Sequence, residues 1–311
     1  MAKKRDKNPF NITVKSILFT ILLLYALSMI LVLLWGLITS LKNSADLDVG
    51  NYLGLPNLKW SREEALKLAN YQGVFKDMSV KARSAFYSGS RYIVHTSNTG
   101  FIGLVFNTIM YSIVGSLLAS VVPAIVGYLC AKFKYKLSGI IYTVVIITMT
   151  IPIIGNTPAT VNLLRSLGLY DTFMGYFIQR LGFGGMYFLM YYAFFLSFSD
   201  TYIEAAEIDG ANHYAILLKI IIPLSLKMIG TVFLIMFVSY WNDYTTALMF
   251  MPTHPTLAYA IYLKAVGPDA SVGSIPYKIA ACMMLAIPIL IIFVFFKDKI
   301  MGNLTMGGIK G

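Results

Sequence analysis

Residues 199–223 read SDTYIEAAEIDGANHYAILLKIIIP, and this polar stretch interrupts a chain that is otherwise strongly apolar. It holds four acidic residues within ten positions: Asp200, Glu204, Glu207 and Asp209. Long apolar segments flank it on both sides, so it connects two parts of the chain that a membrane would hold. A structured acidic segment in this position is either an ordinary loop or a docking site for another protein.

The residues of this stretch predict two short helices joined by a tight turn. Thr201 and Glu204 have capping-box spacing, in which the two side chains bond amides at the start of a helix. Gly210 permits the left-handed conformation that commonly closes a helix. Asn212 can then cap a second helix, which we predict over 213–222.

The composition of the whole chain is typical of membrane proteins with several spans. Of its 311 residues, 58% are hydrophobic and 13% are charged, and the mean hydropathy is +0.71. A soluble domain carries about 25% charged residues. The net charge of +11 does not indicate a nucleic-acid partner, because the cations cluster beside apolar runs, as membrane topology requires. Cys130 and Cys282 lie in apolar segments and indicate neither a disulfide nor a metal site.

Six apolar segments predict an all-α membrane protein with six transmembrane helices. We place these helices at 16–39, 101–130, 137–155, 181–198, 224–250 and 278–296. An even number of spans puts both termini on the same side of the membrane.

Positive charges decide which side that is. Thirteen Lys and Arg residues in short segments lie on the side of the termini and the 199–223 loop, against four on the other side. Short cytoplasmic segments carry the excess of positive charge. We therefore predict the following divisions: a cytoplasmic basic tail (1–15), a first helix (16–39), an extracellular loop region (40–100), a core of five helices around the cytoplasmic loop (101–298), and a cytoplasmic tail (299–311).

The extracellular region is expected to be a packed loop. A capping box that starts at Ser61 predicts a short helix through about Asn70.

The stretch EAAEIDGANHYAILLKIIIP resembles the signature loop of ABC importer permeases, in which EAA is followed by glycine at the seventh position and a late proline. The matching residues are Glu204, Ala205, Ala206, Gly210, Ile220, Ile222 and Pro223, with isoleucine at 222 in place of the commoner leucine. Tyr240-Trp241-Asn242-Asp243 is similar to the S-W-N-D sequence of the sugar-uptake class. LTMGGIKG at 304–311 is similar to the terminus of that class, as in maltose permeases. The resemblance covers about residues 100–311.

This resemblance implies a MetI-like permease core with one extra N-terminal helix. In the family, the loop forms a coupling helix that sits in a cleft of a cytoplasmic ATPase, and the tail makes a second contact. The residues implied in ATPase contact are Glu204, Ala205, Ala206, Asp209, Gly210, Lys310 and Gly311. The implied partners are a second permease subunit, two copies of the ATPase, an extracellular solute-binding protein and the lipid of a bacterial inner or cytoplasmic membrane. The chain itself would bind no cofactor and catalyse no reaction, because the ATPase hydrolyses ATP.

Polar and aromatic residues in or beside the predicted spans are candidates for the substrate path. They are Asn107, Asn156, Tyr240, Trp241, Asn242 and Asp243. An acid within a membrane segment is a functional candidate, but Asp243 can also cap a helix or pair with a buried donor. Trp241 and Tyr240 can stack on a sugar or anchor at the membrane interface. The two asparagines can instead form hydrogen bonds between helices.

Other function classes lack their expected motifs. The chain has no G-x-x-x-x-G-K-[ST] loop for ATP, and no H-E-x-x-H or G-x-S-x-G motif of a membrane enzyme. A self-contained secondary transporter would predict inverted repeats and charge pairs within the membrane. We therefore expect a subunit that forms half of the translocation pathway for a sugar, most simply an oligosaccharide. A polyol or sugar-phosphate permease and a secondary transporter are the alternatives.

Overall fold

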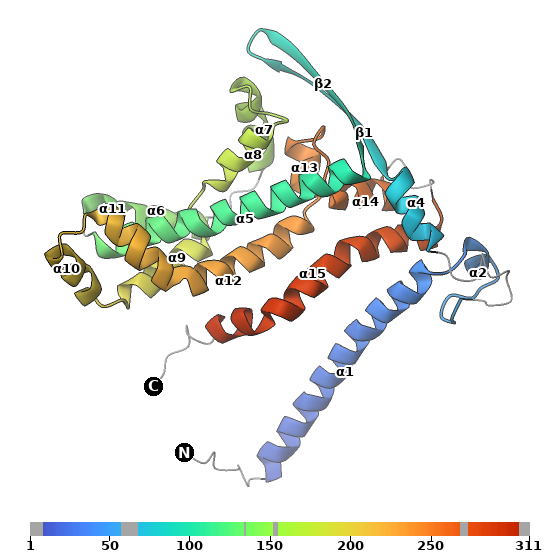
Figure 1. Cartoon of the computed structure of the whole chain (residues 1–311), viewed down its shortest axis with the longest axis horizontal. Helices are drawn as coiled ribbons and strands as arrows, with labels where there is room; N and C mark the ends of the chain where they lie inside the picture. Colours follow the sequence, from blue (N-terminus) through green and yellow to red (C-terminus); the bar gives the residue numbers. More distant parts are fainter. Residues whose placement is uncertain (1–8, 57–67, 134, 152–154, 268–272, 305–311) are drawn as a thin grey trace.

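The computed structural model describes residues 9–56, 68–133, 135–151, 155–267 and 273–304. Within these ranges the chain is mostly helical, and four helices are long and apolar enough to cross a membrane. These candidate spans are Thr13–Ser40, Phe101–Lys132, His213–Trp241 and Ile275–Phe296. They belong to α1 (Pro9–Ser40), α5 (Phe101–Lys132), the helix that ends in α12 (Ile222–Trp241), and α15 (Ile275–Leu304) (Figure 1).

Helix α5 lies at the centre of the molecule, packed along α12 and α9 (Met186–Leu196) (Figure 1). Small residues allow the backbones of α5 and α9 to approach closely. A side chain at Gly127 would place its Cβ 3.0 Å from Tyr191 Cβ and 3.1 Å from the Tyr192 nitrogen. Small residues serve the same purpose at helix contacts within membranes generally.

Helix α1 packs at the edge of the molecule, against α15 (Figure 1). Its apolar side chains are mostly exposed, as expected for a helix whose surroundings are lipid. Gly36 lies at this contact, and a Cβ there would come within 2.9 Å of the Met283 Cε, so the methionine side chain would have to shift.

Two of the six predicted spans are short helices in the structure. Helix α6 (Lys136–Thr150) has 15 residues and α9 has 11, so they extend about 22 and 16 Å at 1.5 Å per residue. A hydrocarbon core is about 30 Å thick. The count of six spans therefore stays a prediction. The mixed segment that follows α6 forms two more short helices, α7 (Asn156–Ser166) and α8 (Phe173–Arg180).

The fifth predicted span, 224–250, is wrong at both ends. The helix begins at α11 (His213–Ile216) and continues through a π-helical turn (Leu217–Ile221) into α12. Pro223 lies in the first turn of α12, where its missing backbone donor is tolerated, and it follows the π-helical turn, whose hydrogen-bond pattern is wider than that of an α-helix. The helix then ends at Trp241, and α13 (Thr245–Phe250) is separate.

The all-α prediction is wrong for part of the region 40–100, which we predict to be extracellular. Strands β1 (Ser79–Ser88) and β2 (Arg91–Gly100) form an antiparallel hairpin that projects from the body of the molecule (Figure 1). Gly89 has a positive φ of 59°, which a two-residue hairpin turn requires. The predicted helix around 61–70 lies largely outside the described residues, and α4 (Ala69–Asp77) begins near its expected end.

Short helices and side-chain bonds join the span ends on the hairpin side of the molecule. Asn70 of α4 donates to the carbonyl oxygens of Ser40 and Lys42 at 2.8 and 2.9 Å, just after α1. Phe75 of α4 contacts Phe101 at the start of α5. Helix α2 (Ser44–Asp48) follows α1, and α14 (Leu257–Ala265) packs on α5 and α15. The opposite ends of the four long helices therefore lie on the side that carries the 199–223 loop.

Candidate functional site

The 199–223 loop forms a helix, a glycine turn and a second helix, as the sequence predicts. Helix α10 (Thr201–Ile208) begins at the expected residue, and Gly210 adopts a left-handed φ of 80°. Asn212 caps α11 by accepting a hydrogen bond from the Ala215 nitrogen at 2.8 Å. The capping box is wrong in detail, because the amide of Glu204 bonds the Asp200 carbonyl at 3.0 Å instead of a Thr201 side chain.

The outer surface of this loop carries large apolar side chains. Ile208 is 87% exposed, and Tyr202 in the first turn of α10 is also exposed. The predicted contact residues Glu204, Ala205, Asp209 and Gly210 are exposed on the same loop. Ala206 instead packs inward against the core of α5 and α9. Lys310 and Gly311 lie outside the described residues.

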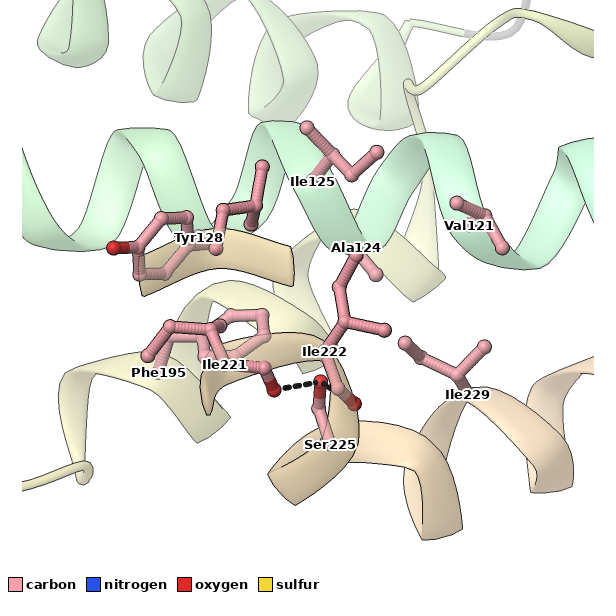
Figure 2. A pocket seen from close by; sticks show the side chains of 10 residues that line it. Val121, Ala124, Ile125, Tyr128, Phe195, Ile221, Ile222, Ser225 and Ile229 are labelled. Carbon is pink, nitrogen blue, oxygen red and sulfur yellow. Dashed lines mark hydrogen bonds between the residues drawn. The ribbon is translucent and has the colours of Figure 1, made fainter. Parts of the chain in front are cut away.

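Beneath the loop, α5, α9 and α12 enclose a small apolar cavity (Figure 2). Tyr128 and Phe195 contribute rings to its lining, and Ser225 donates to the Ile221 carbonyl at 2.6 Å. The remaining lining side chains are aliphatic: Val121, Ala124, Ile125, Leu217, Ile221, Ile222 and Ile229. An aliphatic lining offers no hydrogen bonds to sugar hydroxyls, so this cavity belongs to the packing that supports the loop.

Asp243 joins the central helix to the turn after α12. Its Oδ2 accepts a hydrogen bond from the Tyr111 hydroxyl of α5 at 2.5 Å. Its Oδ1 accepts from the Thr246 nitrogen at 3.0 Å, at the start of α13. Both structural alternatives considered for this acid, a helix cap and a bond to a buried donor, are therefore present together.

An arginine and three tyrosines surround this contact. Tyr111 and Tyr176 of α8 stack with ring centroids 4.2 Å apart. The guanidinium of Arg180 lies 4.8 Å from the centre of the Tyr176 ring and 4.6 Å from that of Tyr240. We did not predict Tyr111, Tyr176 or Arg180; the only signal in the sequence was a charged residue in a weakly apolar segment. The structure thus brings Tyr240 and Asp243 into one polar aromatic cluster, which we call the Asp243 cluster.

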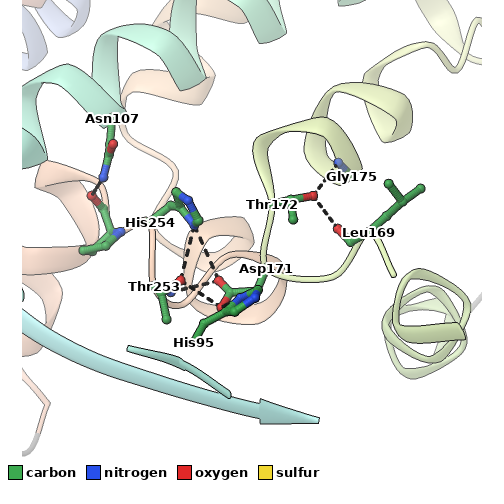
Figure 3. Close-up of polar contacts among 9 residues, drawn as sticks. His95, Asn107, Leu169, Asp171, Thr172, Gly175, Thr253 and His254 are labelled. Atoms are coloured by element: carbon green, nitrogen blue, oxygen red, sulfur yellow. Dashed lines mark hydrogen bonds and ion pairs between the residues drawn. The ribbon is translucent and has the colours of Figure 1, made fainter. Parts of the chain in front are cut away.

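The other predicted path residues have local or structural bonds. Trp241 is buried and donates its ring nitrogen to the Leu285 carbonyl of α15 at 3.0 Å. Asn242 bonds the Val238 carbonyl one turn earlier in its own helix. Asn107 of α5 donates to the Pro255 carbonyl at 3.0 Å (Figure 3), so it joins a helix to a loop. Asn156 is exposed at the start of α7 and lies outside the Asp243 cluster.

A second buried carboxylate, Asp171, connects the hairpin to the loop between α13 and α14 (Figure 3). Thr253 donates its amide and its hydroxyl to the two carboxylate oxygens at 2.9 and 2.8 Å. The Nδ1 atoms of His95 and His254 lie 3.0 and 3.6 Å from these oxygens. Burial raises the pKa of Asp171, but the hydrogen bonds from His254, Thr253 and His95 outweigh burial and hold the pKa below its usual range. Among the described residues no group of three or more His, Cys, Asp or Glu side chains is placed to hold a metal ion.

Comparisons with known proteins agree with the loop and the helical core. Residues 123–300 match the family described as "Binding-protein-dependent transport system inner membrane component". The chain is similar to a sulfoquinovosyl glycerol transport system permease protein of Agrobacterium fabrum, with 25% identity over 89% of this chain and 88% of the relative. It is also similar to a trehalose transport system permease protein of Mycobacterium tuberculosis, with 26% identity over 68% of this chain and 78% of the relative.

The fold is similar to that of a solved bacterial ABC transporter involved in the import of the acidic polysaccharide alginate. The TM-score is 0.71 at 21% identity, over 95% of this chain and 99% of that chain. The family match covers more than half of the 311 residues. Members of this family are non-enzymatic membrane components of ABC importers that work with an ATPase, a partner permease and a solute-binding protein. The chain therefore belongs to the inner-membrane permease components of binding-protein-dependent ABC importers, in a group whose relatives take up sugars.

Proposed function

We propose that this chain forms half of the translocation pathway for an oligosaccharide and is driven by a cytoplasmic ATPase that contacts the 199–223 loop. The observation that carries the proposal is the exposed apolar surface of α10. Ile208 and Tyr202 lie outside the candidate membrane spans. An exposed apolar surface beside polar residues is typical of a protein-binding site.

The membrane orientation follows from the same proposal. With the 199–223 loop in the cytoplasm, the hairpin and α4 lie outside the cell, and the start of α1 and the end of α15 lie inside. The excess of Lys and Arg in short segments beside the loop supports this orientation. In this arrangement, a second permease subunit would complete the pathway, two ATPases would dock inside, and a solute-binding protein would deliver the sugar outside.

The names of the relatives support a sugar as substrate. They include transporters of a sulfoquinovosyl glycerol, of trehalose and of arabinooligosaccharides. These substrates share at least one glycosyl unit linked to a second group, which supports a glycoside or oligosaccharide over a free polyol. Within the Asp243 cluster, Tyr240 and Asp243 are partly exposed, and they offer an aromatic ring and a carboxylate of the kinds that recognise sugars.

A docking experiment tests the proposal directly. The chain is co-expressed with a candidate partner permease and a candidate ABC ATPase, and the ATPase recovered with the tagged chain is measured. Ile208→Asp should abolish recovery of the ATPase while membrane insertion stays normal. Leu167→Asp serves as the matched control, because Leu167 is exposed after α7, away from the loop. Equal recovery of the ATPase with Ile208→Asp and with the unmodified chain would reject docking at α10.

A further inference from the structure

The C-terminal end of α5 holds the chain just before α10. Lys132 Nζ donates to the Phe198 carbonyl at 2.6 Å, where the segment after α9 ends. The same atom donates to Asp200 Oδ1 at 2.6 Å, and Asp200 directly precedes α10. The Lys132 side chain is 8% exposed, whereas that of Asp200 is 70% exposed. A cation that is almost completely buried thus depends on two oxygens of the loop for its hydrogen bonds.

The next residue of the chain contacts the other end of the loop. The ring of Phe133 meets that of His213 edge-on, with centroids 5.5 Å apart, and His213 is the first residue of α11. His213 Nδ1 in turn lies 3.8 Å from a carboxylate oxygen of Glu207 on α10. Two consecutive residues, one at the end of α5 and one just after it, therefore contact the chain before and after α10.

The N-terminal half of α5 forms hydrogen bonds with the Asp243 cluster and with α14. Tyr111 donates to Asp243, and Thr108 accepts a hydrogen bond from the Leu257 nitrogen of α14 at 2.8 Å. Lys132 and Tyr111 are 21 positions apart in one helix, which is about 32 Å at 1.5 Å per residue. Helix α5 is continuous between these two residues, with Pro123 inside it, so a single element links the two contacts.

We propose that the Lys132–Asp200 pair couples movement of α10 to α5, and through α5 to the Asp243 cluster. Both are positioning residues: neither needs to touch the sugar or the ATPase. The inference rests on the proposed function, because it assumes that an ATPase moves α10. If the loop moved away from Lys132, the buried ammonium would lose its carboxylate without gaining water, which is costly. The pair therefore keeps Lys132 and Asp200 together when either moves. When α10 moves, the end of α5 therefore moves with it.

The test uses the complete transporter in proteoliposomes, with transport and ATP hydrolysis measured on the same sample. Asp200→Asn removes the charge from an exposed side chain and should leave folding intact. It should keep ATPase assembly, and hydrolysis within about twofold, while the sugar transported per ATP falls at least fivefold. Lys132→Met should have the same effect, and the double variant should be no worse than either single one. Lys132→Arg, which keeps the charge and the donors, should retain at least half of the normal ratio.

Lys136→Met is the matched control, because Lys136 is exposed on the first turn of α6 and shows no bond to α10 among the described residues. It should leave the ratio unchanged. A normal transport-to-ATP ratio in Asp200→Asn would overturn the inference. An equal loss of transport and of ATP hydrolysis, with an unchanged amount of sugar transported per ATP, would also overturn the inference, because it would indicate a purely structural contact. If Lys132→Met fails to assemble, Asp200→Asn alone decides. An unmodified complex that retains no ATPase would reject the proposed function itself.

Discussion

The Tyr111 hydroxyl donates a hydrogen bond to Asp243 across 132 positions of sequence, and this contact joins the middle of the molecule to the end of α12. Tyr111 is fully buried, and its ring stacks on Tyr176. The carboxylate also caps α13 through the Thr246 amide. Asp243 therefore fixes the relative positions of α5, α12 and α13. Several of the residues that we predicted for the substrate path lie at this junction.

Removing the Tyr111 hydroxyl should destabilise the protein. In Tyr111→Phe the half-buried carboxylate of Asp243 loses a donor, and hydrogen bonds to charged groups contribute about 1.5–3 kcal/mol. Thermal unfolding of the purified protein in detergent measures the loss. Tyr25→Phe is the control, because Tyr25 is exposed on α1. Equal unfolding temperatures for the two variants would show that the Tyr111–Asp243 bond contributes nothing to stability.

Arg180 should not be replaceable by lysine. Its planar guanidinium stacks on two tyrosine rings, and each cation–π contact contributes about 0.5–2 kcal/mol, which a lysine ammonium does not reproduce in the same geometry. Arg165→Lys provides a comparison, because Arg165 stacks on one ring, that of Tyr170. We expect Arg180→Lys to lower the unfolding temperature more than Arg165→Lys. The reverse order would contradict a role for the double stack.

Acid should remove the stabilisation that Asp171 provides. Its pKa in the folded protein lies below the usual value, so its contribution to stability is complete above the unfolded pKa of about 3.9 and is lost as pH falls through the lower folded value. Asp171→Asn should lower the unfolding temperature at pH 7, and the difference from the unmodified protein should shrink below about pH 4. Unfolding measured from pH 7 to pH 3 tests this. A constant difference in unfolding temperature between Asp171→Asn and the unmodified protein over this pH range would refute the argument.

The turn at Gly210 should accept asparagine but not valine. Its φ of 80° is left-handed, which costs most L-residues about 1–2 kcal/mol and a β-branched residue more, while asparagine tolerates it. No atom lies within 4 Å of a Cβ built at this position, so strain and not a clash decides the outcome. Uptake and recovery of the ATPase should stay near normal in Gly210→Asn and fall severely in Gly210→Val. Equal uptake by both variants would show that the turn geometry is not needed.

Local signals predicted the loop well. The start of α10, the left-handed turn and the Asn212 cap each depend on residues within four positions of one another. The hairpin was missed because its two ten-residue strands lie in a region rich in polar residues, where the alternation of apolar and polar residues is weak. The end of α12 was misplaced because residues 228–250 contain one charged residue, Asp243, and the bond of Asp243 to Tyr111 depends on the packed helices.

The sequence by itself determined the class of protein, the four longest helices, the loop and the family resemblance. Hydropathy acts residue by residue, and helix caps act within one turn, so both can be read without knowing which segments meet. Only the tertiary structure decided which residues form hydrogen bonds with the charged groups: Tyr111 with Asp243, Thr253 with Asp171, and Lys132 with Asp200. The two members of each pair are 68 to 132 positions apart in the sequence. They meet only once the helices have packed, and a charge taken out of water needs such a partner. For the 199–223 loop, the sequence supplied the helix and the turn, and the packing supplied its attachment to α5.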